Sequence, residues 1–208
     1  MDKKKTMKIT GVIFDFGGVL LKWKPQKILS RHFADQPLAS EAFLKEINFM
    51  EWNAQQDKGR SFSEGVALLS KEYPHYSHII RAFQDNWEDS IDGLIEESIE
   101  LLEKLKEMGL SIYGLSNWSA ETFPVVRKRY KFFDLFDGII ISGEVKLIKP
   151  DPAIFYLCLS RMGRPANECL FIDDSEANIL AAKTIGFDTI HFKSPGQLRI
   201  ELQDRGLL

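Results

Sequence analysis

The sequence predicts an α/β protein, with a doubly wound parallel-sheet, Rossmann-like core and an inserted helical cap. Two observations lead to this prediction. Residues 1–21 and 93–208 alternate strand-like apolar runs with amphipathic helical stripes, an order typical of parallel sheets. Residues 22–92 are instead helical in pattern, rich in aromatic residues and without a convincing strand. We therefore expect a core domain from the two outer segments. Residues 22–92 should form a cap domain over the carboxyl ends of the strands, where such sheets bind ligands.

Composition argues against several classes of protein. The chain has 208 residues, 44% of them hydrophobic and 27% charged, which is usual for a globular protein with a core. Its net charge of −3 leaves no broad basic surface, so we expect no nucleic-acid partner. No apolar run approaches the length of a membrane span, so we expect no membrane partner. Cys158 and Cys169 fit no zinc or disulfide framework and are expected to be buried thiols in a reducing cytoplasm.

The first strand is expected over residues 9–14, a β-branched apolar run that ends at Asp15. Gly17 and Gly18 follow, and they allow the backbone to fold tightly over whatever the carboxylate contacts. A buried strand that ends in an acid and two glycines holds that acid at the rim of a parallel sheet. Alone the pattern is weak, because an acid before two glycines is also ordinary turn chemistry.

Residues 22–92 carry signals for several helices, interrupted by a polar turn at residues 57–60. These signals are, in chain order, Pro25 in a first turn, Ser40 as a cap, Ser61 with Glu64 at capping-box spacing before a stop at Pro74, and a further helical stretch over residues 75–87.

The remainder of the chain alternates helix and strand. Strands are expected over residues 110–115, 138–141, 170–172 and 189–192, and the intervening helices are opened by Ser119, by Asp151 with Pro152, by Ser175, and by Ser194 with Gln197.

Polar residues fall at the carboxyl ends of successive expected strands. Taken singly, each except Asp15 has an ordinary explanation as a turn residue, a surface charge or a helix cap. Taken together, three acids, a lysine and a hydroxyl at one rim are hard to explain as unrelated loops. Clustered carboxylates need counter-charge, which a divalent cation and a lysine supply. The set consists of Asp15, Ser116 with Asn117, Lys149, and Asp173 with Asp174.

Four segments carry a family resemblance. FDFGGVL, LSNWS, the lysine of KLIKPDP, and FIDDSEAN resemble, in order, the four motifs of the haloacid dehalogenase-like hydrolase superfamily. The resemblance spans the whole chain, including a small helical cap after the first strand, and the four motifs together are highly specific. The cap stretch EWNAQQDKGRSFSEG also resembles caps of bacterial members of the phosphatase-like branch.

The resemblance implies a magnesium-dependent phosphohydrolase of a small phosphorylated metabolite. Asp15 would attack phosphorus and form an aspartyl-phosphate, and Lys149 would neutralise charge on both nucleophile and phosphate. Asp15, the carbonyl of Gly17 and Asp174 would hold Mg²⁺, and Asp173 would lie next to these ligands without binding the metal directly. Ser116, Asn117 and the loop at Gly18 would contact the phosphate. Asn178 would orient the site, with an exposed helix position as an equal alternative.

Residue 17 departs from the family pattern. Phosphatases of this superfamily usually carry a second aspartate there, as general acid and base, and this chain has Gly17. Such an acid typically contributes about a hundred- to ten-thousand-fold in rate. We therefore expect a preference for good leaving groups such as sugar 1-phosphates, unless a cap residue such as Asp57 supplies the acid.

Other residues are weaker candidates. Trp118 follows the phosphate-binding pair and is predicted, at even odds with packing, to wall the substrate pocket. Asp57 and Arg60 are the best cap candidates for substrate contact, with a plain polar turn as the stronger explanation. Packing explains the remaining tryptophans better, and a solvated helix face explains the two histidines with one-face spacing: Trp23, Trp52, Trp87, His75 and His78.

Two rival functions stay open. Asp15 is also the residue that would hydrolyse a carbon–halogen bond, which needs neither a metal nor an acid at residue 17. The adjacent Asp173 and Asp174 would oppose a halide there without a cation. A non-catalytic relative that keeps the phosphate site is the other rival. The sequence specifies neither the substrate nor the oligomeric state.

Overall fold

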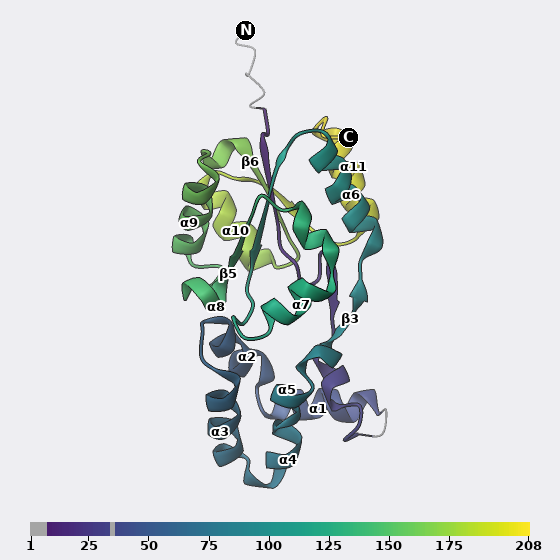
Figure 1. The fold of residues 1–208 in the computed structure, drawn as a ribbon, viewed down its shortest axis with the longest axis vertical. Coiled ribbons are helices and arrows are strands. Elements are labelled where there is room, and N and C mark those ends of the chain that lie inside the picture. Colours follow the sequence, from purple (N-terminus) through teal and green to yellow (C-terminus); the bar gives the residue numbers. More distant parts are fainter. Residues whose placement is uncertain (1–7, 34–35) are drawn as a thin grey trace.

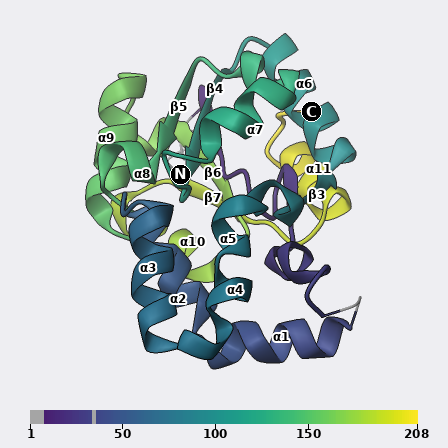
Figure 2. The same ribbon diagram turned by 60° about the horizontal axis from the view of Figure 1, so that its bottom comes forward.

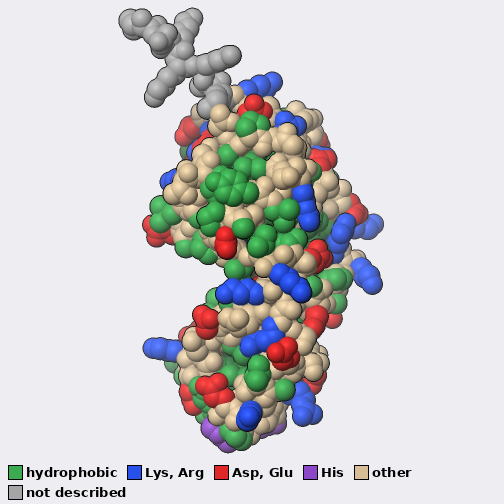
Figure 3. Space-filling view, turned by 90° about the vertical axis from the view of Figure 1, so that its left-hand side faces the viewer, with side chains coloured by type: hydrophobic (Ala, Val, Ile, Leu, Met, Phe, Trp, Pro, Cys, Tyr) green, Lys and Arg blue, Asp and Glu red, His purple; other side chains and the backbone are tan. Residues whose placement is uncertain are grey.

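The computed structural model describes residues 8–33 and 36–208, arranged as two lobes joined at a narrower waist (Figures 1 and 3). In the larger lobe, five described strands form a sheet of order β5-β4-β1-β6-β7, and every neighbouring pair is parallel. The predicted α/β architecture is confirmed. The strands are β1 (Gly11–Phe14), β4 (Ser111–Ser116), β5 (Gly138–Ile141), β6 (Cys169–Asp173) and β7 (Asp188–His191).

Strand β1 occupies the middle of the sheet and is buried along its whole length. Its last residue, Phe14, pairs with Gly114 of β4 and Ile172 of β6. Because parallel neighbours end at the same edge, this register places Asp15 beside the carboxyl ends of both strands. The rim predicted from sequence therefore exists.

Helices cover both faces of the sheet (Figure 1). Ile13 of β1 packs with Phe155 and Ile179 on one face, whereas Val12 packs with Leu102 and Leu198 on the other. The alternation along β1 thus divides the apolar core into two layers. The first face carries α9 (Pro152–Met162) and α10 (Glu176–Ile185), and the second carries α6 (Glu96–Glu107) and α11 (Pro195–Asp204), with α7 (Phe123–Arg129) nearby.

Helix caps confirm several of the local predictions. Ser61 Oγ accepts a hydrogen bond from the Glu64 amide, Asp151 from Ala153, and Ser194 from Gln197. Ser119 is an exception, because it accepts from the Glu121 amide in a turn while α7 begins later, at Phe123.

The smaller lobe contains the helices of residues 22–92, for which we keep the name cap (Figure 2). Aromatic rings hold it together, with Phe83 lying 4.9 Å from Phe49 and 5.2 Å from Trp52 between ring centroids. Its elements are the 3₁₀ turns Pro25–Leu29, Pro74–Tyr76 and Trp87–Ser90, and helices α1 (Pro37–Glu46), α2 (Phe49–Asp57), α3 (Phe62–Glu72), α4 (Ser77–Ile80) and α5 (Ala82–Asp85).

Two predictions about the cap are wrong, and a third holds only in part. Ser40 lies inside α1 and does not cap it. The stretch at 75–87 is helical as predicted, but it is divided into short 3₁₀ and α-helical turns. The segment also starts and ends in strands, since β2 (Leu21–Trp23) and β3 (Ile91–Leu94) form an antiparallel ribbon. These strands are too short to show a period of two in the sequence. The residue limits of the two domains, which fall within this ribbon, stay a prediction.

Two further sequence expectations concern cysteines and membranes. Cys158 and Cys169 are both buried free thiols, as predicted. Among the described residues, no helix combines the length and the apolar character needed to cross a membrane.

Candidate active site

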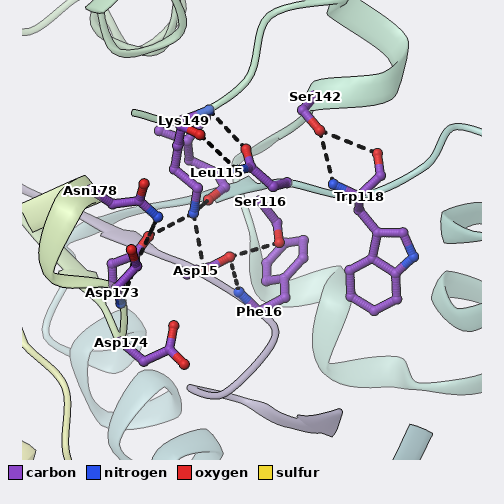
Figure 4. A network of polar contacts seen from close by, with 12 residues as sticks. Asp15, Phe16, Leu115, Ser116, Trp118, Ser142, Lys149, Asp173, Asp174 and Asn178 are labelled. Carbon is purple, nitrogen blue, oxygen red and sulfur yellow. Dashed lines mark hydrogen bonds and ion pairs between the residues drawn. The ribbon is translucent and has the colours of Figure 1, made fainter. Parts of the chain in front are cut away.

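Asp15 is held at the rim by three neighbours (Figure 4). One carboxylate oxygen, Oδ1, accepts hydrogen bonds of 2.7 Å from Ser116 Oγ and from the Phe16 amide. The other, Oδ2, lies 3.1 Å from Lys149 Nζ. Its own amide still donates to Ile172 O across the sheet. The side chain is therefore fixed in direction while one end faces away from the sheet, which suits a nucleophile.

Lys149 places a buried cation between two acids. Its Nζ lies 3.1 Å from Asp15 Oδ2 and 2.7 Å from Asp173 Oδ2, and it donates to Leu115 O at 2.8 Å. Burial alone would lower the pKa of this ammonium. The negative charges of Asp15 and Asp173 raise it by more than burial lowers it, so the pKa of Lys149 lies above its usual value. Lys149 therefore stays charged, and the surface charge considered as an alternative is excluded.

Asp173, the last residue of β6, is fully buried and fully bonded. Oδ1 accepts from the Ser175 amide and Oδ2 from Lys149, while Asn178 Nδ2 donates to both oxygens at 3.0 and 3.1 Å. Asn178 is itself buried, so it orients the site and is not an exposed helix position. With every lone pair engaged, Asp173 acts by holding Lys149 in place.

Asp174 has a different environment. It is an exposed residue whose carboxylate stands apart from the bonded network (Figure 4). It lies against the loop after β1, where a Cβ on Gly18 would meet Asp174 Oδ2 at 2.1 Å. Gly18 also has a φ of +74°, a conformation that favours glycine there.

The three acids form a site with the chemistry of a divalent-cation centre. Asp15, Asp173 and Asp174 each offer a ligand atom within 4.8 Å of the others, the one such group among the described residues. Burial raises the pKa of Asp15 to about 7; Lys149 and Ser116 lower it, whereas Asp173 and Asp174 raise it. Lys149 alone does not balance these charges. Oxygen donors suit Mg²⁺, and Asp15, Asp174 and the carbonyl of Gly17 are the groups that would hold it.

Two residues predicted to contact the substrate have other positions. Asn117 Nδ2 donates to the Lys149 carbonyl and Asn117 Oδ1 accepts from the Lys149 amide, each at 2.9 Å. Asn117 therefore holds the loop that carries the lysine. Trp118 is 6% exposed and packs between Trp87 and Phe16, so it belongs to the core and does not wall the pocket. Residue order at a strand end does not determine which way each side chain turns.

Ser142 is a site residue that the sequence reasoning missed. Fully buried, it begins the short helix α8 (Ser142–Val145) directly after β5. Its Oγ accepts from the Trp118 amide at 2.9 Å and donates to the Asp57 carbonyl of the cap at 2.6 Å. The rule that selected Ser116, a hydroxyl at the carboxyl end of a strand, would also have selected Ser142.

The two cap candidates differ in position. Arg60 turns into the cap, donating to Gln56 Oε1 at 2.6 Å and to Trp52 O at 3.0 Å. Asp57, the last residue of α2, is partly buried, and its Oδ2 accepts from Asn53 at 3.0 Å. Burial and the negative charge of Asp15 raise the pKa of Asp57 to about 7, whereas the Asn53 bond lowers it. Asp57 is thus the cap residue whose pKa responds to the charge of the nucleophile.

Known proteins of several activities are similar to this chain. Residues 9–186 match the haloacid dehalogenase-like hydrolases. The chain is 28% identical over 184 residues to a sesquiterpene phosphatase of Aspergillus oryzae, covering 86% of this chain and 87% of the relative. It is 23% identical over 198 residues to a drimenol cyclase of Aspergillus calidoustus, covering 93% of this chain and 36% of that protein. An (S)-2-haloacid dehalogenase of Burkholderia cepacia is 30% identical over 100 residues, which are 48% of this chain and 43% of the relative.

A solved structure extends this similarity to the fold. A HAD family enzyme from Bacteroides thetaiotaomicron, in complex with magnesium and inorganic phosphate, superposes with a TM-score of 0.68 at 26% identity. The match covers 89% of this chain and 95% of the other. The similarity therefore includes both lobes.

Proposed function

This chain belongs to the haloacid dehalogenase-like hydrolase family, and from that premise we propose that it is a magnesium-dependent phosphatase of a small phosphorylated metabolite. Phosphatases occur among its relatives, and a structural neighbour holds magnesium and phosphate together. The cation would offset the charge of the acids and polarise a phosphoryl oxygen when bound.

The observation that carries the proposal is the position of Asp174. A site that needed only a nucleophile and a lysine would be complete with Asp15, Lys149 and Asp173. Asp174 adds a further carboxylate over Gly18, within 4.8 Å of the other two. Such an acid repels an anionic substrate unless a cation lies between them, and phosphate with Mg²⁺ meets that condition.

The residues divide the chemistry as follows. Asp15 attacks phosphorus, the bond to the leaving oxygen breaks, and an aspartyl-phosphate forms that water then hydrolyses. Ser116 and the Phe16 amide hold one Asp15 oxygen, which leaves the other to react. Lys149 balances negative charge as the phosphoryl group arrives, and Asp173 and Asn117 keep it in position.

For the substrate we propose sugar 1-phosphates and other esters with good leaving groups. Residue 17 carries no side chain, so the loop of the nucleophile contributes no proton to the departing oxygen. Leaving groups that bear negative charge well need that proton least.

The test is phosphate release from 4-nitrophenyl phosphate and from a panel of phosphorylated metabolites, with Mg²⁺ and with chelator. Release that requires Mg²⁺ and disappears in Asp15→Asn is the expected result. Halide release from 2-haloacids in chelator would instead support the dehalogenase reaction of the Burkholderia cepacia relative. Inactivity in both assays, with Mg²⁺ still bound, would support a non-catalytic role.

A further inference from the structure

We propose that Asp57, a residue of the cap, carries the proton that the loop of the nucleophile cannot supply. This inference rests on the proposed phosphatase function and concerns one step of it. It removes the basis of the leaving-group preference given above, because with an acid in the cap esters with poor leaving groups are substrates as well. Asp57 would protonate the leaving oxygen and then accept a proton from the attacking water. Three observations support it: the fixed position of the turn at residues 57–60, the surroundings of the Asp57 side chain, and the open space at residue 17.

The turn after α2 is fastened to the rim of the sheet. Ser142 Oγ donates to the Asp57 carbonyl at 2.6 Å and accepts from the Trp118 amide, two residues after Ser116. Gly59, with a φ of +100°, packs so closely that a Cβ there would lie 3.0 Å from Gly143 O. Helix α2 contacts α8, and Figure 1 draws the two close together. The backbone of Asp57 is therefore held at the end of β5, on the same rim of the sheet as the nucleophile at the end of β1.

The side chain of Asp57 is suited to proton transfer. Its Oδ2 is held by Asn53, and no described residue hydrogen bonds to Oδ1. Asp15 is the charge that acts on it from the core, and it opposes ionisation of Asp57. Directly after α8, Lys146 lies beside Gly59, two residues beyond Asp57 in the turn, and the Arg60 side chain is hydrogen-bonded inside the cap. A carboxyl group with a pKa of about 7 exists in both protonation states near neutral pH, as a general acid and base must.

No other described acid of the cluster is available for this task. Asp15 is the nucleophile, Asp173 is saturated by hydrogen bonds, and Asp174 is reserved for the cation. Residue 17 offers empty space, because a Cβ built there meets nothing within 4 Å. The position where relatives of this superfamily carry an acid thus faces a space that a substrate or a cap side chain can use.

The proton balance closes over one turnover. In the first step the Asp15–phosphorus bond forms, the bond from phosphorus to the leaving oxygen breaks, and Asp57 gives its proton to that oxygen. In the second step water attacks the phosphorus, Asp57 takes a proton from the water, and the Asp15–phosphorus bond breaks. The products are an alcohol and inorganic phosphate, and both aspartates return to their starting states.

The experiment compares leaving groups. Asp57→Asn keeps an oxygen that can accept from Asn53 but cannot carry the proton. We expect its kcat/KM to fall about a hundredfold or more for glycerol phosphate, and less than about fivefold for 4-nitrophenyl phosphate, whose leaving group needs little assistance. Asp85→Asn, at the exposed end of α5, is the matched control and should change neither value.

A second variant distinguishes loss of the proton donor from a merely structural effect of the Asp57→Asn change. Adding Gly17→Asp to Asp57→Asn places a carboxyl in the open space. The double variant should have a kcat/KM for glycerol phosphate at least about tenfold higher than that of Asp57→Asn alone. An equal loss for both substrates, or an unchanged ratio between them, would overturn the role of Asp57. A wild-type protein without magnesium-dependent phosphatase activity would instead overturn the proposed function itself.

Discussion

The core and the cap hold their functional residues in opposite ways. In the core, Asp15 and Asp173 lie at the ends of buried neighbouring strands, and Lys149 pairs with both. Each acid also accepts further hydrogen bonds, Asp15 from Ser116 and Asp173 from Asn178. In the cap, Asp57 has one side-chain partner, Asn53, and its place is set by the docking of a turn on α8. The core is preorganised by its own network, whereas the contribution of the cap depends on contact between the two lobes.

The two lobes are also stabilised differently. The core rests on a sheet buried on both faces, with apolar layers on each side. The cap depends on aromatic packing around Phe83 and on Trp52 Nε1 donating to Gly65 O at 2.9 Å. A Cβ on Gly65 would lie 2.7 Å from Gln56 Oε1, so α2 and α3 are closely packed. Removing the buried cation of the core should therefore affect chemistry and stability together, whereas amide replacement of a single carboxylate should affect chemistry more than stability.

The largest expected effect is on the nucleophile. Asp15→Asn should reduce phosphatase turnover by at least about a thousandfold, because an amide cannot form the covalent intermediate. The melting temperature should stay within a few degrees, since the amide oxygen can still accept from Ser116. Steady-state assays and a thermal melt check both points. Retention of a tenth of wild-type activity would show that another residue is the nucleophile.

The next effect concerns the buried cation. Lys149→Met leaves the Asp15 and Asp173 carboxylates facing each other without counter-charge, which should destabilise the fold by about 3–5 kcal/mol in addition to abolishing activity. Urea unfolding measures the change. Adding Asp173→Asn should recover part of the stability but no activity. A loss below about 1 kcal/mol would mean that the core network is less strictly coupled than its geometry indicates.

The same contrast explains what could be predicted from the sequence. Parallel strands end at one edge, so Asp15, Ser116, Lys149, Asp173 and Asp174 could be brought together from their positions after apolar runs alone. The direction in which the side chains next to this rim turn could not be predicted from the sequence. Trp118 follows the rim but packs on Trp87, a residue of a distant segment. Asn117 likewise bonds the Lys149 backbone, a contact that only the folded loops create.

The cap was harder to predict for a related reason. Its strands have three and four residues, and α4 and α5 have four each, which is too short for a periodic pattern to appear. Ser40 resembles a helix cap in sequence, yet Pro37 starts α1 earlier. Local signals succeeded where a capping bond decides the helix start, as at Ser61.

A smaller effect tests the cation site. Added Mg²⁺ should raise the melting temperature, because it binds the folded state and offsets repulsion among the acids; at 100 times the dissociation constant the gain is about 2.7 kcal/mol. Asp174→Ala should remove most of this rise while leaving the metal-free melt nearly unchanged, because its carboxylate is outside the bonded network. An undiminished rise in that variant would exclude Asp174 as a main ligand.

The smallest effect is a pH-dependent change in stability, measured in chelator, that follows from the raised pKa of Asp57, which burial causes first and the charge of Asp15 second. The pKa of Asp57 is about 7 in the folded protein and 3.8 in an unfolded reference. Its contribution to stability is therefore complete below pH about 4 and is lost as pH rises through about 7. Asparagine does not titrate, so Asp57→Asn should gain stability relative to wild type as pH rises from about 5 to about 8.

The size of this gain follows from the shift. A rise of about three pKa units corresponds to at most about 4 kcal/mol, and partial solvent exposure of Asp57 reduces the expected difference to about 1–2 kcal/mol. In a chain of this size that is a change of roughly 2–8 °C in melting temperature. Asp15 titrates in both proteins, so its contribution largely cancels, and the exposed Asp85→Asn variant should show no such trend. A flat difference between Asp57→Asn and wild type across this pH range would mean that neither burial nor the charge of Asp15 raises the pKa of Asp57, and the cap would then be a cover without a part in proton transfer.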